Sequence, residues 1–228
     1  MIDVVRNIDI NDKLDALYER YCKDYLIEYI KAFADSEPPH RINEFGIIDV
    51  ERYDTDKGIL FLAKETNGWS NEDYANGVLF REWLKGIIQN GLSGHVRKHP
   101  IMWYNIGRWA SYLNDQAQSI ATLANEKAEV ISAIGTVAFT NMNKVRGMAQ
   151  AQTEYWKLAY SDIAGSLLRE ELAILQPKVI VCCGTYYEFK HHIPYYEGNL
   201  IDMPHPGART STVEMLEQLA SQLKGDTL

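Results

Sequence analysis

The sequence contains few cysteines, and this scarcity excludes several classes of protein. Its three cysteines, Cys22, Cys182 and Cys183, are too few for a disulfide framework or a closed four-ligand metal site. Cys182 and Cys183 are adjacent within a Val/Ile run, which favours reduced core residues over a redox or metal role. We therefore expect neither a metal nor a cofactor.

Long hydrophobic runs and an excess of basic residues are also absent. No stretch approaches the roughly 18 apolar residues of a membrane span, and residues 1–15 lack the basic start and apolar block of a signal peptide. We therefore expect a cytoplasmic protein without a membrane partner. The net charge of −8 argues against broad binding to polyanions, because such binding needs a basic surface that displaces counterions. A local basic cleft remains compatible with this charge.

The composition is sufficient for one large domain. The 228 residues are 46% hydrophobic and 11% aromatic, which supplies a sizeable core. No internal repeat, low-complexity tract or linker marks a second domain. We predict a single domain over residues 1–228, with residues 1–57 as an N-terminal helical extension packed on it. Asn11 is the expected cap of a helix with a Tyr-rich face: Leu14, Leu17, Tyr18, Tyr21, Tyr25, Tyr29 and Phe33.

Short apolar runs alternate with longer helical patterns along the chain. The runs predict buried strands at 58–63, 135–140, 178–183 and 199–203. Helices are expected at 79–91, 101–113, 118–135 and 153–177, and a last helix opens on a Ser211/Glu214 capping box and ends at Gly225. Strands buried on both faces that alternate with helices are typical of an open α/β sheet with right-handed crossovers.

Polar residues follow the predicted strands, and in open α/β sheets ligands bind outside the carboxyl ends of the strands. These residues are Glu65, Thr66, Asn67, Asn141, Asn143, Lys144, His205 and Arg209. A carboxylate beside a buried strand needs a partner or a function, which favours a functional Glu65. Pro204 and Pro206 fix the backbone around His205, which suits a group whose position matters. Other interpretations stay open: Asn67-Gly68 as a simple turn, Asn141 as a partner of loop backbone, and Lys144 as a solvated charge.

In their order along the chain, these segments resemble the motifs of the uracil-DNA glycosylase superfamily. Lys64-Glu65-Thr66-Asn67-Gly68 is similar to the motif after the first strand, and "VAFTNMNKV" to the motif after the second. His205-Pro206-Gly207-Ala208-Arg209 is similar to the closing His-Pro-Ser motif. The resemblance implies a three-layer αβα sandwich with a central four-stranded parallel sheet. The chain differs in having Thr66 where the most active branch has Asp, and its three cysteines cannot build the four-cysteine iron–sulfur cluster of one branch.

The resemblance also implies a function and a role for each residue. The expected activity is that of a DNA glycosylase, which excises uracil or a related deaminated base by hydrolysis of the N-glycosidic bond, so the expected partner is DNA that contains such a base. The implied catalytic residues are His205, Glu65 and Thr66, the base-binding residues Asn141, Phe80 and Asn67, and the phosphate-binding residues Lys144 and Arg209. Two alternatives remain: a divergent member that binds a nucleobase, nucleotide, other small ligand or protein without cleavage, and a small-molecule hydrolase built on Glu65 and His205.

Overall fold

The structure is a computed structural model, and it describes most of the chain. The described residues are 2–33, 39, 41–67, 79–90, 100–147 and 153–225, with the backbone alone for residues 66, 67, 90, 100, 128, 146, 147 and 225. Within this part of the chain, no helix is long and apolar enough to cross a membrane.

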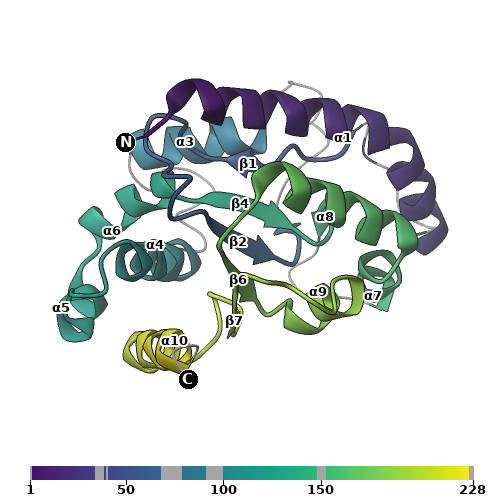
Figure 1. Cartoon of the computed structure of the whole chain (residues 1–228). Helices are drawn as coiled ribbons and strands as arrows, with labels where there is room; N and C mark the ends of the chain where they lie inside the picture. The colour runs from purple at the N-terminus through teal and green to yellow at the C-terminus, as the bar shows by residue number, and fades with distance from the viewer. Residues whose placement is uncertain are drawn as a thin grey trace.

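A mixed five-stranded sheet forms the centre of the molecule (Figure 1). In spatial order its strands are β1 (Gly46–Ile47), β4 (Ala138–Asn141), β2 (Ile59–Ala63), β6 (Val179–Cys183) and β7 (Asn199–Met203). β4, β2, β6 and β7 are parallel, and they overlap the four predicted strands. The expected sheet of four parallel strands is nevertheless wrong in one respect, because β1 pairs antiparallel with the edge of β4. A separate pair of short strands, β3 (Thr66–Asn67) and β5 (Arg146–Gly147), extends beyond the sheet.

Helices cover both faces of the sheet, consistent with the expected αβα arrangement (Figure 1). One face carries α3 (Phe80–Asn90), α4 (Pro100–Asn114), α6 (Ala128–Ala133) and α10 (Thr212–Gly225), with α5 (Ile120–Asn125) packed beside α4 and α10. The other face carries α1 (Val4–Ala32), α8 (Asp162–Leu175) and α9 (Tyr186–His192), with α7 (Thr153–Ala159) beside α1 and α8. A short 3-10 helix, η2 (Ile134–Thr136), leads into β4.

Two predicted helices are each interrupted. The predicted helix 153–177 divides into α7 and α8, because Ser161 has extended backbone and its hydroxyl caps α8 by accepting from Ala164 N at 3.3 Å. The predicted helix 118–135 divides into α5 and α6, and Arg108 donates to the carbonyl of Glu126 at the break (2.8 Å). These interruptions depend on local capping and on a distant guanidinium, which hydrophobic periodicity does not reveal.

The first helix starts earlier than Asn11 and is held to the sheet by that residue. α1 begins at Val4, and Asp3 caps it by accepting from the backbone N–H of Arg6 at 3.0 Å. Asn11 lies inside the helix, where its amide accepts from Ile47 N and donates to Ile47 O, both at 2.9 Å. The expected apolar face is confirmed, because Leu14, Leu17, Tyr18, Tyr25 and Tyr29 are buried. α1 therefore packs on α8 and fixes the edge strand β1 at the same time.

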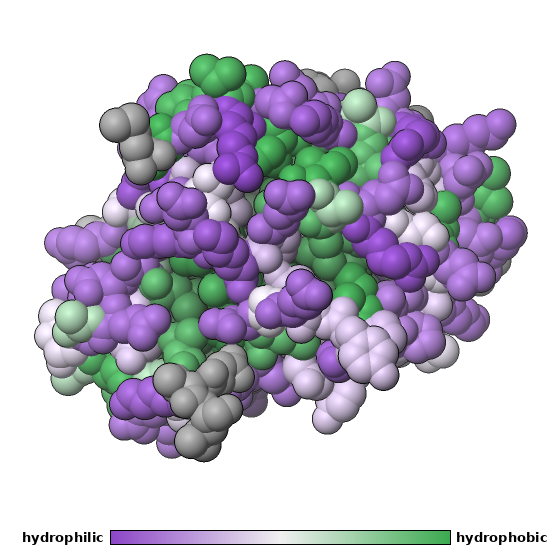
Figure 2. All heavy atoms as spheres, in the orientation of Figure 1, coloured by the Kyte–Doolittle hydropathy of each residue, from purple (hydrophilic) through white to green (hydrophobic). Residues whose placement is uncertain are grey.

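The surface is mostly hydrophilic on the face shown in Figure 2. Apolar side chains appear there as separate patches, and side chains of intermediate hydropathy gather at the lower right, over α9. The interior is continuous, since one cluster of buried residues includes all five residues of β2. Cys182 and Cys183 are free thiols in this core, as predicted, and burial raises the pKa of both.

Candidate functional site at the carboxyl edge of the sheet

The strand order has a switch point at the carboxyl ends of β2 and β6. The chain passes from β2 to β4 on one side and then crosses to β6 on the other side, so the order reverses between β2 and β6. Such a switch point is where ligands bind in open α/β sheets. Gly184, which follows β6, has a φ of +73° that favours glycine. A Cβ there would lie 3.3 Å from His205 N and 3.6 Å from Lys64 Cε, so three strand ends meet at this point.

Lys64 and Glu65 lead out of β2 into this edge. The Lys64 ammonium lies 5.7 Å from the ring centroid of Tyr155 and 5.1 Å from that of Trp156, both on α7. Glu65 is half-buried, and the charge of its carboxylate contributes to the raised pKa of Tyr155 on the same helix. Burial is the main cause of that raised pKa, followed by the charge of Glu188, whose carboxylate accepts from the Tyr155 hydroxyl at 3.2 Å.

Thr66 and Asn67 continue the chain from Glu65 as strand β3. Their backbones pair with Arg146 and Gly147 of β5. Their side chains lie outside the described residues, so the predicted roles of Thr66 in catalysis and Asn67 in base binding stay predictions. Thr66-Asn67 is therefore part of a separate two-stranded sheet that continues from the ends of β2 and β4.

His205 follows β7 and holds its imidazole in one tautomer. The backbone N–H of Gly207 donates to Nδ1 at 3.1 Å, so the neutral ring carries its proton on Nε2. The residue is exposed at the sheet edge, yet surrounding protein partly desolvates the ring, and this desolvation followed by the Lys64 charge lowers the pKa of His205. The imidazole is therefore a neutral hydrogen-bond donor at pH 7.

Hydrogen bonds hold the segment that follows His205, and its turn at Gly207 is crowded. Asn105 of α4 donates to the carbonyl of Pro206 at 2.8 Å, and Ala208 N donates to the carbonyl of His205 at 2.8 Å. A Cβ on Gly207 would lie 3.3 Å from both Nδ1 and Cε1 of His205, so a larger residue would push on the imidazole. These contacts support the expectation that the position of His205 matters.

Two buried asparagines lie at the end of β4, Asn141 as its last residue and Asn143 just beyond it. Asn141 is buried, its carbonyl accepts from the Lys144 ammonium, and it pairs with Ala63 in the sheet. Asn143 is 1% exposed, and its backbone N–H donates to the carbonyl of Lys64 at 2.9 Å. Neither atom of the Asn143 amide has a hydrogen-bond partner within the described part of the chain. A buried amide without partners is costly, which makes it a candidate for ligand recognition.

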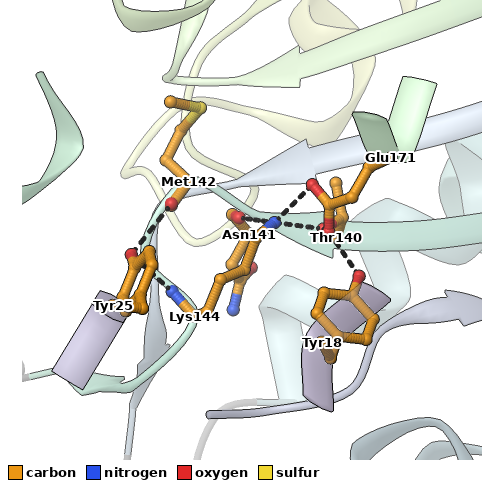
Figure 3. A network of polar contacts seen from close by, with 7 residues as sticks. All are labelled: Tyr18, Tyr25, Thr140, Asn141, Met142, Lys144 and Glu171. Atoms are coloured by element: carbon orange, nitrogen blue, oxygen red, sulfur yellow. Dashed lines mark hydrogen bonds and ion pairs between the residues drawn. The ribbon is translucent and has the colours of Figure 1, made fainter. Parts of the chain in front are cut away.

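Lys144 is 1% exposed and lies in a buried polar network, so nothing in the structure supports its predicted contact with a DNA phosphate (Figure 3). Its ammonium is buried and donates to Thr140 Oγ1 at 2.7 Å, to Glu171 Oε2 at 2.7 Å and to the carbonyl of Asn141. All three N–H donors of the ammonium are thus used inside the protein. Burial lowers the pKa of Lys144, while the Glu171 carboxylate opposes that effect.

The buried network around Lys144 joins α1, β4 and α8 (Figure 3). The Glu171 carboxylate also accepts from the hydroxyls of Thr140 (3.0 Å) and Tyr18. Tyr25 of α1 accepts from Lys144 N at 3.0 Å and donates to the carbonyl of Met142 at 3.4 Å. The network therefore fixes the segment that follows β4, which carries Asn141 and Asn143.

Phe80 and Arg209 have opposite surroundings. Phe80 is 3% exposed, and its ring centroid lies 5.0 Å from that of Phe45, 5.5 Å from Trp83 and 5.9 Å from Phe139. It packs in the aromatic core, and its role in stacking on a base stays a prediction. Arg209 is exposed just before the capping box of α10, where Glu214 N donates to Ser211 Oγ at 3.1 Å. Its position is compatible with a phosphate contact.

Together, the fold and this site define an α/β protein with a polar site at the carboxyl edge of a largely parallel sheet. No family model matches the sequence, and no curated protein or solved structure matches it significantly.

Proposed function

We propose that the protein is a DNA glycosylase that hydrolyses the N-glycosidic bond of uracil or a related deaminated base. The observation that carries the proposal is the protonation state of His205. Its imidazole is neutral, Nδ1 accepts a hydrogen bond from the backbone N–H of Gly207, and the proton on Nε2 is therefore free to be donated to a ligand. A donor of this kind stabilises the negative charge that develops on a departing base. The proposal also rests on the resemblance of the strand-end motifs to the uracil-DNA glycosylase superfamily.

The proposed reaction starts with a target base outside the stack, because its glycosidic bond is not accessible inside a duplex. The bond between C1′ of the sugar and the base nitrogen breaks, and its electron pair leaves with the base. His205 Nε2–H donates a hydrogen bond to the base oxygen that gains charge. Water adds to C1′ and gives its proton to the Glu65 carboxylate, and the base anion is later protonated from solvent.

The buried amide of Asn143 supports recognition of a base in this proposal. An amide offers one donor face and one acceptor, which match the donor and acceptor edge of uracil. The resemblance assigns this task to Asn141, and that assignment stays a proposal. Asn143 adds a second candidate, because both of its amide atoms lack hydrogen-bond partners within the described residues.

The activity is tested with labelled oligonucleotides that contain uracil, hypoxanthine or xanthine, followed by alkaline cleavage of abasic sites. His205→Ala is expected to lower the single-turnover rate at least about tenfold, given the roughly 10²–10³ typical of an oxyanion-stabilising donor. Thr210→Ala, an exposed neighbour in the same loop, is the matched control and is expected to keep the wild-type rate. No strand breakage with stoichiometric protein would reject the proposal.

Binding without hydrolysis is a second candidate, favoured by a specific observation. Phe80 is in the core and Lys144 is in a buried ion pair, so two side chains to which the resemblance gives DNA contacts are packed against other parts of the protein. The same assay distinguishes the candidates: saturable binding of a uracil-containing strand over an undamaged one, with no abasic product, would support this second function.

A further inference from the structure

The outward face of α1 carries exposed branched aliphatic side chains at both of its ends. Near the start of the helix Val5 is 78% and Ile8 47% exposed, and near its end Ile27 is 42% and Ile30 48% exposed. α1 contacts β1, α7 and α8 with its buried face, and Figure 1 shows it along the upper edge of the molecule. Scattered single apolar residues are normal on a surface, but two pairs on one helix suggest a contact.

The two apolar pairs lie on one line of residues along α1. We call this line the outer stripe, and its members, all of them exposed, are Val5, Ile8, Asp12, Ala16, Glu19, Lys23, Ile27 and Ile30. Successive members are three or four residues apart, an average close to the 3.6 residues of a helical turn. They therefore share one face of a straight helix. Since α1 has 29 residues, the stripe extends along most of a helix about 43 Å long.

The charged members of the outer stripe have no partner within the described part of the chain. Asp12, Glu19 and Lys23 form no ion pair and no side-chain hydrogen bond there. Most charged residues beside the stripe are in ion pairs, which are Lys13–Asp9, Arg20–Glu170, Lys31–Glu28 and Arg81–Asp15. Arg6 and Asp24, further round the helix, carry opposite charges that cancel. The charges of the stripe itself are thus available to a partner.

The outer stripe has the same pattern of apolar residues from either end. When a second copy of α1 runs antiparallel, with the two-fold axis at the middle of the stripe, Val5 faces Ile30 of the partner subunit. In the same arrangement Ile8 faces Ile27 of the partner subunit. Symmetry repeats both contacts at the other end, so all the exposed aliphatic side chains of the stripe are covered together.

The charges of the outer stripe favour this antiparallel arrangement. Asp12 faces Lys23 of the partner subunit, and symmetry repeats the pair beyond the axis. A parallel arrangement would instead place Asp12 against Asp12 of the partner subunit and Lys23 against Lys23 of the partner subunit, which is unfavourable. Near the axis Glu19 faces Ala16 of the partner subunit, and the two Glu19 residues are about 5 Å apart along the helix direction. The Glu19 carboxylates are therefore the repulsive part of the contact.

We propose that the outer stripe of α1 is the interface of a symmetric, antiparallel homodimer. An isologous interface must be complementary to itself, and the matched ends and opposite charges of the stripe meet this requirement. One helix pair is small for a specific interface and each subunit has a net charge of −8, so the dimer is weak and depends on concentration. The inference goes beyond the proposed function and does not depend on it, because the stripe contains no residue of the candidate site.

The dimer is tested by sedimentation velocity of the whole chain between about 5 and 500 µM, where the average mass is expected to rise toward twice that of the monomer. Ile8→Glu places a carboxylate against Ile27 of the partner subunit at two symmetric positions. It is expected to raise the dimer Kd at least about tenfold. Ile101→Glu on α4 is the matched control, because Ile101 is 62% exposed but lies outside the stripe. Its Kd is expected to stay within about twofold of the wild type.

An exchange of charges tests the register of the two helices. Asp12→Lys and Lys23→Asp each bring like charges together at two positions, and each is expected to raise the Kd at least about fivefold. Asp12→Lys makes each subunit less negative, which by itself would favour association, so a weaker dimer reports the local contact. The double variant Asp12→Lys/Lys23→Asp restores both pairs and is expected to return to within about twofold of the wild type. Glu19→Gln removes the repulsion at the axis and is expected to lower the Kd at least about twofold.

The outcomes separate this interface from the proposed function. A wild type that stays monomeric up to about 500 µM would overturn the dimer. A dimer unchanged by Ile8→Glu would overturn the outer stripe as its interface, and a double charge variant no tighter than the single ones would overturn the antiparallel register. Circular dichroism and urea midpoints confirm that the compared variants are folded. Excision of uracil by a monomer would leave the proposed function standing, and a dimer without excision would leave this interface standing.

Discussion

The buried pair of Lys144 and Glu171 gives the sharpest prediction at the scale of a single residue. Lys144→Met leaves the Glu171 carboxylate buried without its cation, and we expect the free energy of unfolding to fall by about 3–5 kcal/mol in urea denaturation. Lys13→Met is the control, because it removes an exposed ion pair with Asp9 and is expected to cost less than about 1 kcal/mol. Unchanged stability with weaker DNA binding would instead favour the phosphate role that the resemblance implies.

His205 and Lys64 predict how activity depends on pH. The Lys64 charge disfavours the imidazolium form and helps to lower the pKa of His205, so the neutral donor persists below the ordinary pKa of about 6.5. The excision rate is expected to hold as the pH falls through that value and to be lost only at lower pH. Lys64→Met raises the pKa of His205, so the acidic limb of the rate profile moves to higher pH. Lys157→Met on α7 is the control, and a limb at the same pH in Lys64→Met would contradict this coupling.

Residue type and position along the chain predicted part of the site but not its contacts. His205, Glu65 and Arg209 are at the expected edge of the sheet and are not fully buried. Lys144 has the same strand-end position, yet Glu171 from a helix 27 residues later draws it into the core. Asn141 and Asn143 are two residues apart at the end of the same strand. Only the structure shows that the side-chain amide of Asn143 has no hydrogen-bond partner among the described residues. Such differences depend on long-range partners, which a local pattern does not contain.

At the scale of elements, Asn11 joins α1 to the edge strand β1. Asn11→Ala removes both hydrogen bonds to Ile47 and leaves a buried N–H and carbonyl unpaired, so we expect a loss of about 2 kcal/mol or more in urea denaturation. Asn125→Ala is the control, since it removes one exposed bond to the Ala121 carbonyl and is expected to change stability by less than about 0.5 kcal/mol. Equal losses for the two variants would show that β1 does not depend on Asn11.

The edge strand β1 and the four parallel strands differ in how well the sequence predicts them. β2, β4 and β6 are buried along almost their whole length, so short, largely apolar runs indicated them, while β7 was indicated by a run that also contains the exposed Asn199 and Asp202. β1 has only two residues and is held by Asn11, which the sequence suggested as a helix cap. A Cβ on Gly46 would lie 2.6 Å from Asn11 Oδ1, so the glycine is required by a contact across 35 residues of sequence. Propensity does not report such a contact.

At the scale of the whole molecule, the order of the strands determines where the site forms. Alternating strands and helices predicted an open α/β sheet, and right-handed crossovers that run in opposite directions across the sheet place helices on both faces. The reversal of strand order between β2 and β6 then brings Lys64, Gly184 and His205 together, although they are far apart in sequence. The sequence indicated that strand ends would gather at one edge. It did not give their lateral order, and the lateral order decides which ends are neighbours.

The charge distribution of the whole molecule predicts a weak dependence of DNA binding on salt. The net charge is −8, and among the described residues Lys64 and Arg209 are basic side chains at the candidate site. If these two side chains neutralise two phosphates, log K for a single strand falls with log[salt] at a slope of about −1.4, from roughly −0.7 per phosphate. Anisotropy titrations between about 50 and 200 mM salt give this slope, and Arg209→Gln is expected to make it shallower by about 0.7. A slope of about −5 or steeper would mean that a broad basic surface binds the strand, and would contradict binding confined to the candidate site.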